Sequence, residues 1–206
     1  MVLSETVLIL AGGTAVLSIL FGARLAVRAV AGGAAQPPRS DGGEAAATGP
    51  SGAPDVAGVI ALPPFIFLGF LVAAVVLEAV VPLPVLARHA LARYVAGAVL
   101  AVAGFVIIFA AAGRFVAAGT NIPPNLPTTA LVVDGIYRRT RNPLYLGTTL
   151  VYLGLAVAAG SLWAILLMVP LLWVINVGVI VREERYLERK FGDAYRDYTA
   201  RVRRWI

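Results

Sequence analysis

The sequence predicts an all-α, polytopic membrane protein with about five transmembrane helices, including a C-terminal helical hairpin, and an amphipathic cytoplasmic helix at the C-terminus. The chain has 206 residues, of which 60% are hydrophobic and 14% are charged, and its mean hydropathy is +0.86. Soluble domains are about half apolar and about a quarter charged. The apolar excess lies in long blocks that a soluble core does not use, and the basic residues flank these blocks.

The N-terminal part of the chain divides into two segments. Residues 1–30 form a predicted membrane anchor, in which Glu5 precedes the apolar run whereas Arg24 and Arg28 follow it. A cleaved signal peptide carries its positive charge before the apolar core, so this order favours an uncleaved anchor with an outside N-terminus. Residues 31–58 consist mostly of Ala, Gly and Pro. Such a segment buries too little apolar surface to offset its ordering entropy, and we interpret it as a flexible linker.

The remaining residues, 59–206, form the predicted working domain. Gly160 and Ser161 separate its last two apolar stretches, which therefore form a helical hairpin whose first arm is about 24 Å long. The proline-rich segment 120–143 has too few apolar residues to span and is a predicted surface loop. The tail is predicted to be helical through about Phe191, with apolar residues on one face. The four spans of this domain are predicted over residues 63–81, 92–118, 144–159 and 162–181.

Basic residues indicate the orientation of these spans. Five spans with an outside N-terminus place the linker, the proline-rich loop and the tail in the cytoplasm. Of the 17 Lys and Arg residues, all except Arg88 and Arg93 then lie at or near the cytoplasmic side. Membrane proteins show this bias toward positive charge inside. We therefore expect the chemistry of the protein at its inner face.

The composition excludes several classes of function. Cysteine is absent, so there is neither a disulfide framework nor thiolate chemistry. The single histidine, His89, lies in a short connection far from the other polar clusters, and we expect neither a metal site nor a Ser-His-Asp triad. The net charge is +6, but the basic residues flank apolar spans and form no continuous soluble face. We therefore predict no nucleic-acid partner.

A basic cluster precedes the fourth span. Its arginines alone are explained by membrane orientation, but the residues around them suggest more. Gly135 permits an unusual backbone turn, and Pro143 suits the first turn of a helix. Asn142 is then the expected N-cap, beside the positive end of the helix dipole. Guanidinium groups and a helix N-terminus together favour an anion such as a carboxylate or phosphate. The three arginines of this cluster are Arg138, Arg139 and Arg141.

A pair of carboxylates follows the last span. Glu183 and Glu184 alone are explained as the solvated start of a helix. The predicted hairpin, however, returns residues 181–184 to the side of residues 141–145. Carboxylates, arginines and an anion-binding helix start then share one pocket beneath apolar helices. Such a pocket suits a sulfonium-amino-acid nucleotide, with its carboxylate on Arg or Asn, its amine and ribose on Glu and its sulfonium on aromatic faces.

Two stretches carry a family resemblance. "TTALVVDGIYRRTRNPLYLG" and "REERYLERKFGDAYRDYTARVRRWI" resemble the isoprenylcysteine carboxyl methyltransferase and phospholipid methyltransferase superfamily, most of all its bacterial members. The likeness covers roughly residues 56–206. Each motif alone is weak, whereas their ordered combination at matching spacing is specific. The matching positions are Arg141, Pro143, Tyr145, Gly147, Glu183, Glu184, Phe191, Gly192, Tyr195 and Tyr198.

The resemblance implies an S-adenosylmethionine-dependent methyltransferase of the bacterial cytoplasmic membrane, with its active site facing the cytoplasm. Its partners are membrane lipid and a lipophilic acceptor, a carboxylate, an amine or a hydroxyl, that enters from the bilayer. The family's histidine is replaced by Asn142, which donates hydrogen bonds but accepts no proton near neutral pH. Arg141 and Glu184 are the implied catalytic residues. The implied cofactor-binding residues are Tyr137, Arg141, Asn142, Pro143, Tyr145, Leu146, Gly147, Glu183 and Glu184.

Methyl transfer from a sulfonium is an in-line displacement that depends mainly on positioning and desolvation. Glu184 is a candidate proton acceptor for an amine, while Tyr137 and Tyr145 are candidate walls around the sulfonium. Glu78, within the second span, suggests either a function or a snorkelling or protonated group near the outer end. A sterol-reductase-like NADPH enzyme and a non-catalytic scaffold or transporter are the alternatives. The acceptor stays open among a prenylated cysteine carboxylate, an ethanolamine lipid and a small hydrophobic alcohol or amine.

Overall fold

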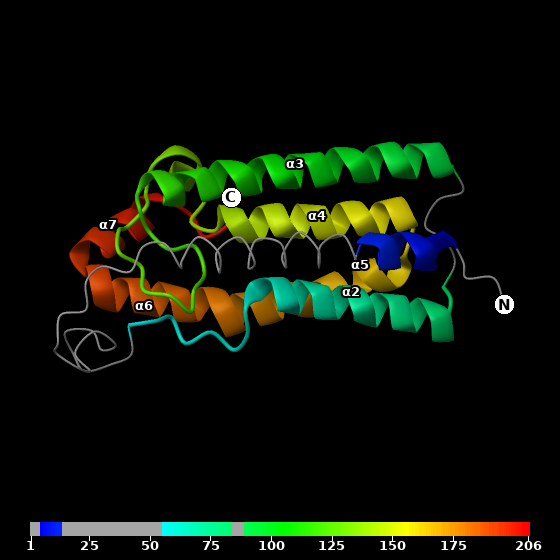
Figure 1. Ribbon diagram of the computed structural model, residues 1–206, viewed down its shortest axis with the longest axis horizontal. Helices are drawn as coiled ribbons and strands as arrows, with labels where there is room; N and C mark the ends of the chain where they lie inside the picture. Colours follow the sequence, from blue (N-terminus) through cyan, green and yellow to red (C-terminus); the bar gives the residue numbers. More distant parts are fainter. Residues whose placement is uncertain (1–4, 14–54, 84–88) are drawn as a thin grey trace, which may run out of the picture.

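The computed structural model of the protein describes residues 5–13, 55–83 and 89–206, which form an elongated bundle of helices (Figure 1). No residue in these ranges lies in a β-strand, so the all-α prediction is confirmed. Residues 5–13 are helical. The other elements are α2 (Pro63–Val80), α3 (Ala90–Ala117), the 3₁₀ turn η1 (Gly135–Arg138), α4 (Pro143–Ala159), α5 (Leu162–Ile175), the π-helix η2 (Asn176–Ile180), α6 (Val181–Phe191) and α7 (Asp193–Arg201).

The helices have the lengths and composition of membrane spans. Within the described ranges, α2, α3 and the continuous helix Leu162–Phe191 are long and apolar enough to cross a bilayer. Helix α4 is also apolar but has only 17 residues, as expected for the short arm of the hairpin. The protein is therefore a polytopic membrane protein. Most of the predicted first span, and most of the 31–58 linker, lie outside the described residues.

The predicted hairpin forms where local sequence signals place it. Helix α4 begins at Pro143, whose missing N–H would have no partner in a first turn. It ends at Gly160, which adopts a left-handed conformation with φ of 66°. Ser161 then caps α5, because its Oγ accepts a hydrogen bond of 3.2 Å from the backbone N of Ala164. The two arms consequently run back along each other.

Glycines set the distance between α3 and α4, which pack closely along their length (Figure 1). A Cβ placed on Gly104 would lie 2.5 Å from the carbonyl oxygen of Gly147, and one on Gly97 would lie 2.5 Å from that of Gly154. Small residues allow such close backbone approach between membrane helices. This seam holds the first turn of α4 in place against α3.

The N-terminal helix packs against the same bundle. Leu10 is fully buried in the main apolar cluster, which also contains Leu71 of α2 and Leu171 of α5. Thr6 Oγ1 donates a hydrogen bond of 3.1 Å to the carbonyl oxygen of Ala159, the last residue of α4. The described part of the predicted 1–30 anchor is therefore in contact with the working domain.

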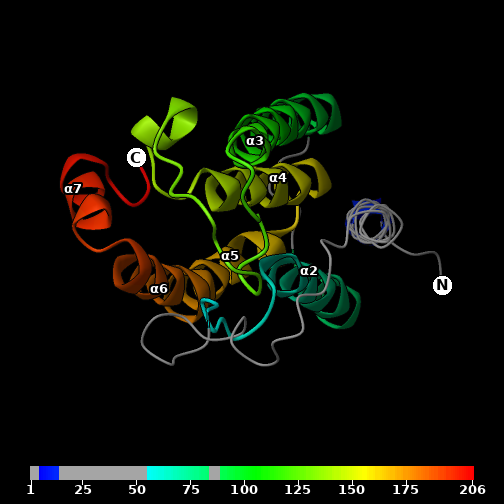
Figure 2. The ribbon, with the colours of Figure 1, turned by 60° about the vertical axis from the view of Figure 1, so that its left-hand side comes forward.

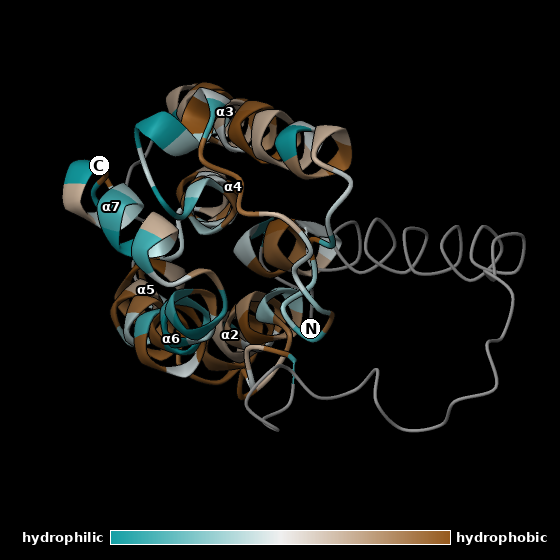
Figure 3. Cartoon of the chain, turned by 90° about the vertical axis from the view of Figure 1, so that its left-hand side faces the viewer, coloured by the Kyte–Doolittle hydropathy of each residue, from teal (hydrophilic) through white to brown (hydrophobic). Residues whose placement is uncertain are grey.

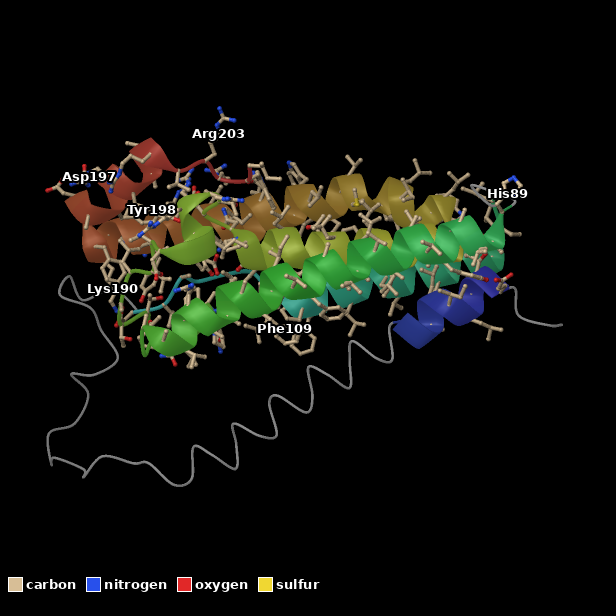
Figure 4. The ribbon with its side chains drawn as sticks, turned by 90° about the horizontal axis from the view of Figure 1, so that it is seen from above. His89, Phe109, Lys190, Asp197, Tyr198 and Arg203 are labelled. Carbon is tan, nitrogen blue, oxygen red and sulfur yellow. The ribbon has the colours of Figure 1, made fainter. Side chains whose placement is uncertain are left out.

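Glu78 joins two elements at the end of the bundle where α2 stops. Its side chain is buried, and its Oε2 accepts a hydrogen bond of 2.9 Å from Ser161 Oγ in the α4–α5 turn. Trp163 Nε1 donates to the carbonyl oxygen of Val81 at 2.7 Å nearby. His89 lies at this same end, far from the labelled tail residues at the other (Figure 4). The hydrogen bond from Ser161 gives Glu78 a structural role in its span, and no substrate contact is needed to explain it.

The second arm of the hairpin and the tail helix form one continuous helix. Helix α5 passes through the π-helix η2 into α6, which ends at Phe191. The sequence predicts the end of the tail helix at this same residue. Gly192, with φ of 54°, then separates α6 from α7. Figure 3 shows hydrophilic residues concentrated on α6, α7 and the nearby loops, while the other helices are largely hydrophobic. We call this the polar end of the bundle.

Residues 55–58, at the end of the predicted linker, form defined contacts with the bundle. Asp55 forms an ion pair with Lys190 of α6, with an Nζ–Oδ1 distance of 2.5 Å. Ala57 N donates to the carbonyl oxygen of Pro124 at 3.2 Å. Residues 55–58 are thus held between α6 and the proline-rich loop, although their composition is that of a linker. The ion pair depends on a partner 135 positions away, which composition does not reveal.

Candidate active site

The start of α4, the proline-rich loop, α6 and α7 lie at the polar end of the bundle (Figure 2). Residues from these elements line a cavity. Apolar side chains of α3, the loop, α4 and α6 line it together with charged and phenolic groups. Its apolar lining includes Phe115, Ile122, Pro124, Leu131, Val132, Leu144 and Leu187, and its polar lining includes Tyr137, Arg141, Asn142, Tyr145, Glu183, Glu184, Tyr195 and Tyr198.

Arg141 lies just before α4 and reaches across to α6. Its Nη1 is 3.3 Å from Glu184 Oε1, and the Arg141 and Glu184 side chains are each 16% exposed. The structure thus brings together the two residues whose meeting the hairpin predicts. Arg141 Nε is buried and has no hydrogen-bond partner among the described residues. Buried donors are nearly always paired, so this nitrogen is suited to a ligand acceptor.

A second contact joins the same two helices. Tyr145 is in the first turn of α4, and its hydroxyl donates a hydrogen bond of 2.7 Å to Glu183 Oε1. Hydrogen bonds to a carboxylate are short and strong, and this one fixes the direction of the carboxylate. Within the described residues, the Tyr145 hydroxyl is the only side-chain partner of Glu183. The carboxylate therefore retains acceptor capacity on the cavity side.

Glu184 has a different set of partners. Besides Arg141, it is bound by Arg204 near the C-terminus, whose Nε and Nη2 lie 3.0 and 2.5 Å from Oε1 and Oε2. This is the bidentate geometry of a guanidinium on a carboxylate. Both Glu184 oxygens are thus held by arginine. In the sequence, Arg204 is one of several arginines in a polar tail, and no motif sets it apart.

Asn142 occupies the predicted N-cap position but forms no side-chain cap hydrogen bond. Its Nδ2 instead donates to the carbonyl oxygen of Arg204 at 2.9 Å. The C-terminal segment thus binds one of the two amide hydrogens, and the predicted role of Asn142 in cofactor binding stays a prediction. Asn142 still lines the cavity, at the start of α4.

Tyrosines form one wall of the cavity. Tyr137 is buried in η1, and Tyr198 of α7 donates a hydrogen bond of 2.7 Å to its carbonyl oxygen. The rings of Tyr195 and Tyr198 lie 6.2 Å apart. Burial raises the pKa of Tyr198 to about 12 and raises the pKa of Tyr137 above its usual range. These phenols are therefore neutral at physiological pH and keep their protons for hydrogen bonding.

Comparison with known proteins gives the family. Residues 92–194, half of the chain, match the family model described as phospholipid methyltransferase. The chain belongs to the phospholipid methyltransferase family. The matched range includes the start of α4 and both glutamates of α6, and it ends before Tyr195, Tyr198 and Arg204.

Two curated relatives match parts of this phospholipid methyltransferase family member. Protein-S-isoprenylcysteine O-methyltransferase of Schizosaccharomyces pombe is 39% identical over 72 residues, which cover 35% of this chain and 30% of the yeast protein. An uncharacterized protein of Haemophilus influenzae is 44% identical over 63 residues, which cover 31% of this chain and all of that protein. No solved structure matches the chain. These findings support a membrane methyltransferase.

Some of the predicted site residues lie away from the cavity. Leu146 is not among its lining residues, and neither is Gly147, which packs against Gly104 of α3. Arg138 and Arg139 are both exposed and do not line it. Conversely, Tyr195 and Tyr198 line the cavity although their motif suggested no contact with a ligand. The described residues include no group of His, Cys, Asp and Glu that could hold a metal ion.

Proposed function

We propose that this family member is an integral membrane S-adenosylmethionine-dependent methyltransferase, and that it acts on a lipophilic acceptor at the cytoplasmic membrane face. The observation that carries the proposal is the convergence of two helix ends on one cavity. Arg141 and Tyr145 from α4 meet Glu184 and Glu183 from α6, at 3.3 and 2.7 Å respectively. Residues 59–206 are the proposed methyltransferase domain, and the bacterial cytoplasmic membrane is its proposed location.

The residues of the cavity fit the proposed cofactor. The unpaired Nε of Arg141 is a donor for a carboxylate. Glu183 retains acceptor capacity for an amine or for ribose hydroxyls. The phenolic wall gives aromatic faces and neutral oxygens for a sulfonium. A zwitterionic nucleotide with a cationic sulfur has a binding partner in each of these three kinds of group.

S-adenosylmethionine, when bound, supplies an electrophilic methyl group. The protein's own residues then position and desolvate the reactants, which are the main contributions available to such a transfer. Arg141 orients a carboxylate, and Glu183, held by Tyr145, orients an amine or hydroxyl. Glu184 has both oxygens bound by guanidinium groups, so we assign it a positioning role instead of the proton-acceptor role suggested by the sequence.

The acceptor is proposed to bind along the apolar lining of the cavity. Phe115, Val132, Leu144 and Leu187 belong to this lining and come from four different segments. Burying a lipid chain against them is favourable at about 25 cal/mol per Å² of apolar surface. The acceptor's reacting group, a carboxylate, an amine or a hydroxyl, then lies toward the charged and phenolic groups. The linker and the N-terminal anchor have no proposed part in the transfer.

Ligand binding to the detergent-purified full chain tests this proposal. We expect S-adenosylhomocysteine to raise the melting temperature in a saturable manner, because a ligand that binds only the folded state stabilises it. Arg141→Ala should abolish the shift, whereas Arg139→Ala, an exposed neighbour, should retain it. Stabilisation by NADPH alone would favour a reductase, and no response to either ligand would contradict a nucleotide-dependent enzyme.

The acceptor is identified by a separate experiment. Native membranes containing the protein are incubated with methyl-labelled S-adenosylmethionine, and lipids are then extracted and separated. We expect label in a lipophilic species, and its absence in membranes carrying Arg141→Ala. Label confined to water-soluble products would contradict the proposed acceptor class while leaving the cofactor assignment intact.

A further inference from the structure

The last residues of the chain cross the start of α4. We call residues 202–206 the C-terminal strap. Arg141 N donates to the carbonyl oxygen of Arg203 at 3.0 Å. Thr140 Oγ1 and Asn142 Nδ2 donate to the carbonyl oxygen of Arg204 at 3.2 and 2.9 Å. Three consecutive residues before α4 are therefore bound by two consecutive carbonyl groups of the strap.

The side chain of Arg204 extends from the strap to α6 and to the π-helix η2. Its guanidinium binds both oxygens of Glu184 on α6, and its Nη1 lies 3.4 Å from Asn176 Oδ1, the first residue of the π-helix η2. π-helical turns inside α-helices are frequent at functional sites. One residue thus connects the start of α4, the π-helical turn and the glutamate pair.

Glu184 is shared between two arginines, and this sharing affects Arg141. Arg204 approaches the carboxylate with a fork at 3.0 and 2.5 Å, whereas Arg141 makes a single contact at 3.3 Å. Without Arg204, the Glu184 carboxylate would attract the Arg141 guanidinium to the oxygen atoms that Arg204 binds. The Nε of Arg141, which has no partner among the described residues, would then be drawn away from a ligand.

We propose that Arg204 is a positioning residue of the active site. It saturates Glu184 so that Arg141 stays available to the carboxylate of the cofactor, and its carbonyl oxygen sets the orientation of Asn142. This inference rests on the proposed function. The strap is also held by Trp205, which packs against the main apolar cluster, so the chain has a second means of keeping the strap in place when the Arg204 side chain is changed.

The test measures the dissociation constant of S-adenosylhomocysteine on the detergent-purified full chain by calorimetry, together with the melting temperature without ligand. We expect Arg204→Gln to weaken binding about tenfold, as for the loss of a charged hydrogen bond, with a nearly unchanged melting temperature. Arg203→Gln is the matched control, since that side chain points away from the protein (Figure 4) and the substitution leaves its carbonyl in place. It should bind as the wild type does.

A double-mutant cycle separates positioning from a general effect on folding. In a Glu184→Gln background, Arg204→Gln should cause much less than its tenfold loss, because the charge that competes for Arg141 is already gone. Equal losses in both backgrounds would overturn the proposal. If Arg204→Gln fails to fold, Arg204→Lys takes its place, since lysine keeps the charge without the fork. Weakened binding by this variant supports the proposal, and unchanged binding overturns it.

The outcomes distinguish this inference from the proposed function. A wild-type protein that does not bind S-adenosylhomocysteine would overturn the function, and the role of Arg204 would be overturned with it. A wild-type protein that binds, together with an Arg204→Gln variant that binds equally well, would overturn the role of Arg204 alone.

Discussion

Two glutamates, the buried Glu78 and the partly buried Glu183, lie near opposite ends of the bundle and show how similar contacts serve different purposes. Glu78 accepts a hydrogen bond of 2.9 Å from the Ser161 hydroxyl, and Glu183 accepts one of 2.7 Å from the Tyr145 hydroxyl. Around Glu78 the partners are elements of the fold, namely the end of α2 and the α4–α5 turn. Glu183 instead lines a cavity, next to a second glutamate and two arginines.

The comparison limits what a buried charge in a membrane helix indicates. Ionisable groups inside membrane segments are by default taken as functional. Arg93, whose Nη1 donates to the carbonyl oxygen of Ala159 at 3.3 Å, shows with Glu78 that such groups can instead hold helix ends together. Arg93 also has a buried Nε without a hydrogen-bond partner among the described residues, so what distinguishes Glu183 and Arg141 is that they line the cavity.

The largest expected effect comes from breaking the α3–α4 seam, on which both ends depend. Gly147→Leu should reduce stability by about 3 kcal/mol, since even its Cβ would lie 2.7 Å from the carbonyl oxygen of Gly104. Gly69→Leu is the control, because nothing lies within 4 Å of a Cβ there. Thermal unfolding followed by size-exclusion chromatography in detergent measures both. Equal stability of the two variants would show that the seam is not closely packed.

The next prediction concerns the glutamate at the polar end. Glu183→Ala should weaken S-adenosylhomocysteine binding by about a hundredfold, since it removes a charged hydrogen-bond acceptor and leaves the Tyr145 hydroxyl unpaired. Glu183→Gln keeps an acceptor for Tyr145 and should lose less. Calorimetry on the purified protein measures both constants. An unchanged affinity in Glu183→Ala would contradict a role in ligand binding and would give Glu183 a purely structural role, like that of Glu78.

Glu78 itself should show the opposite pattern. Glu78→Ala should lower stability by about 1–3 kcal/mol, because the buried Ser161 hydroxyl loses its acceptor. Its affinity for S-adenosylhomocysteine should match that of the wild type when both proteins are folded. The melting temperature and the dissociation constant are measured on the same preparation. A loss of affinity without a loss of stability would remove the distinction between the two ends.

The smallest expected effect is a pH dependence of stability at the polar end. The hydrogen bond from Lys190 lowers the pKa of Asp55 below its usual value of 3.8. A lowered pKa in the folded state adds stability above the unfolded pKa, and that stability is lost as the pH falls through the folded pKa. The melting temperatures of wild type and Asp55→Asn should therefore differ at pH 6 and converge below about pH 3.8. A constant difference would contradict this assignment.

Much of the fold was predictable because its signals are local. The hairpin's turn at Gly160 and Ser161, the start of α4 at Pro143 and the end of α6 at Phe191 all follow from residues at those positions. The convergence of Arg141 with Glu184 also follows, since the end of a hairpin's second arm lies beside the start of its first arm. The contacts of Asp55, at the end of the predicted linker, were not predictable, because a linker-like composition gives no sign of an ion pair with Lys190.

Side-chain direction was not predictable. The motif includes Gly147, but the rotation of α4 turns that residue toward α3 and away from the cavity. Asn142 lines the cavity as its position suggests, but its hydrogen bond to the Arg204 carbonyl oxygen could not be read from the sequence. A helix places a residue at a known height, while its rotation about the axis is decided by packing along its whole length. In the other arm of the hairpin, the π-helical turn η2 changes the direction of the side chains that follow it, including both glutamates of α6.

By itself, the sequence determined the helical class, the membrane-spanning lengths, the hairpin and the family motifs, because hydropathy, proline and glycine act through the nearest residues of the chain. The tertiary structure alone decided which of the two neighbouring C-terminal arginines reaches Glu184. Arg203 and Arg204 are adjacent and chemically identical, and only the path of the strap over α4 turns one outward and the other onto the glutamate. That choice depends on contacts with residues 20 to 64 positions away, which no local pattern encodes.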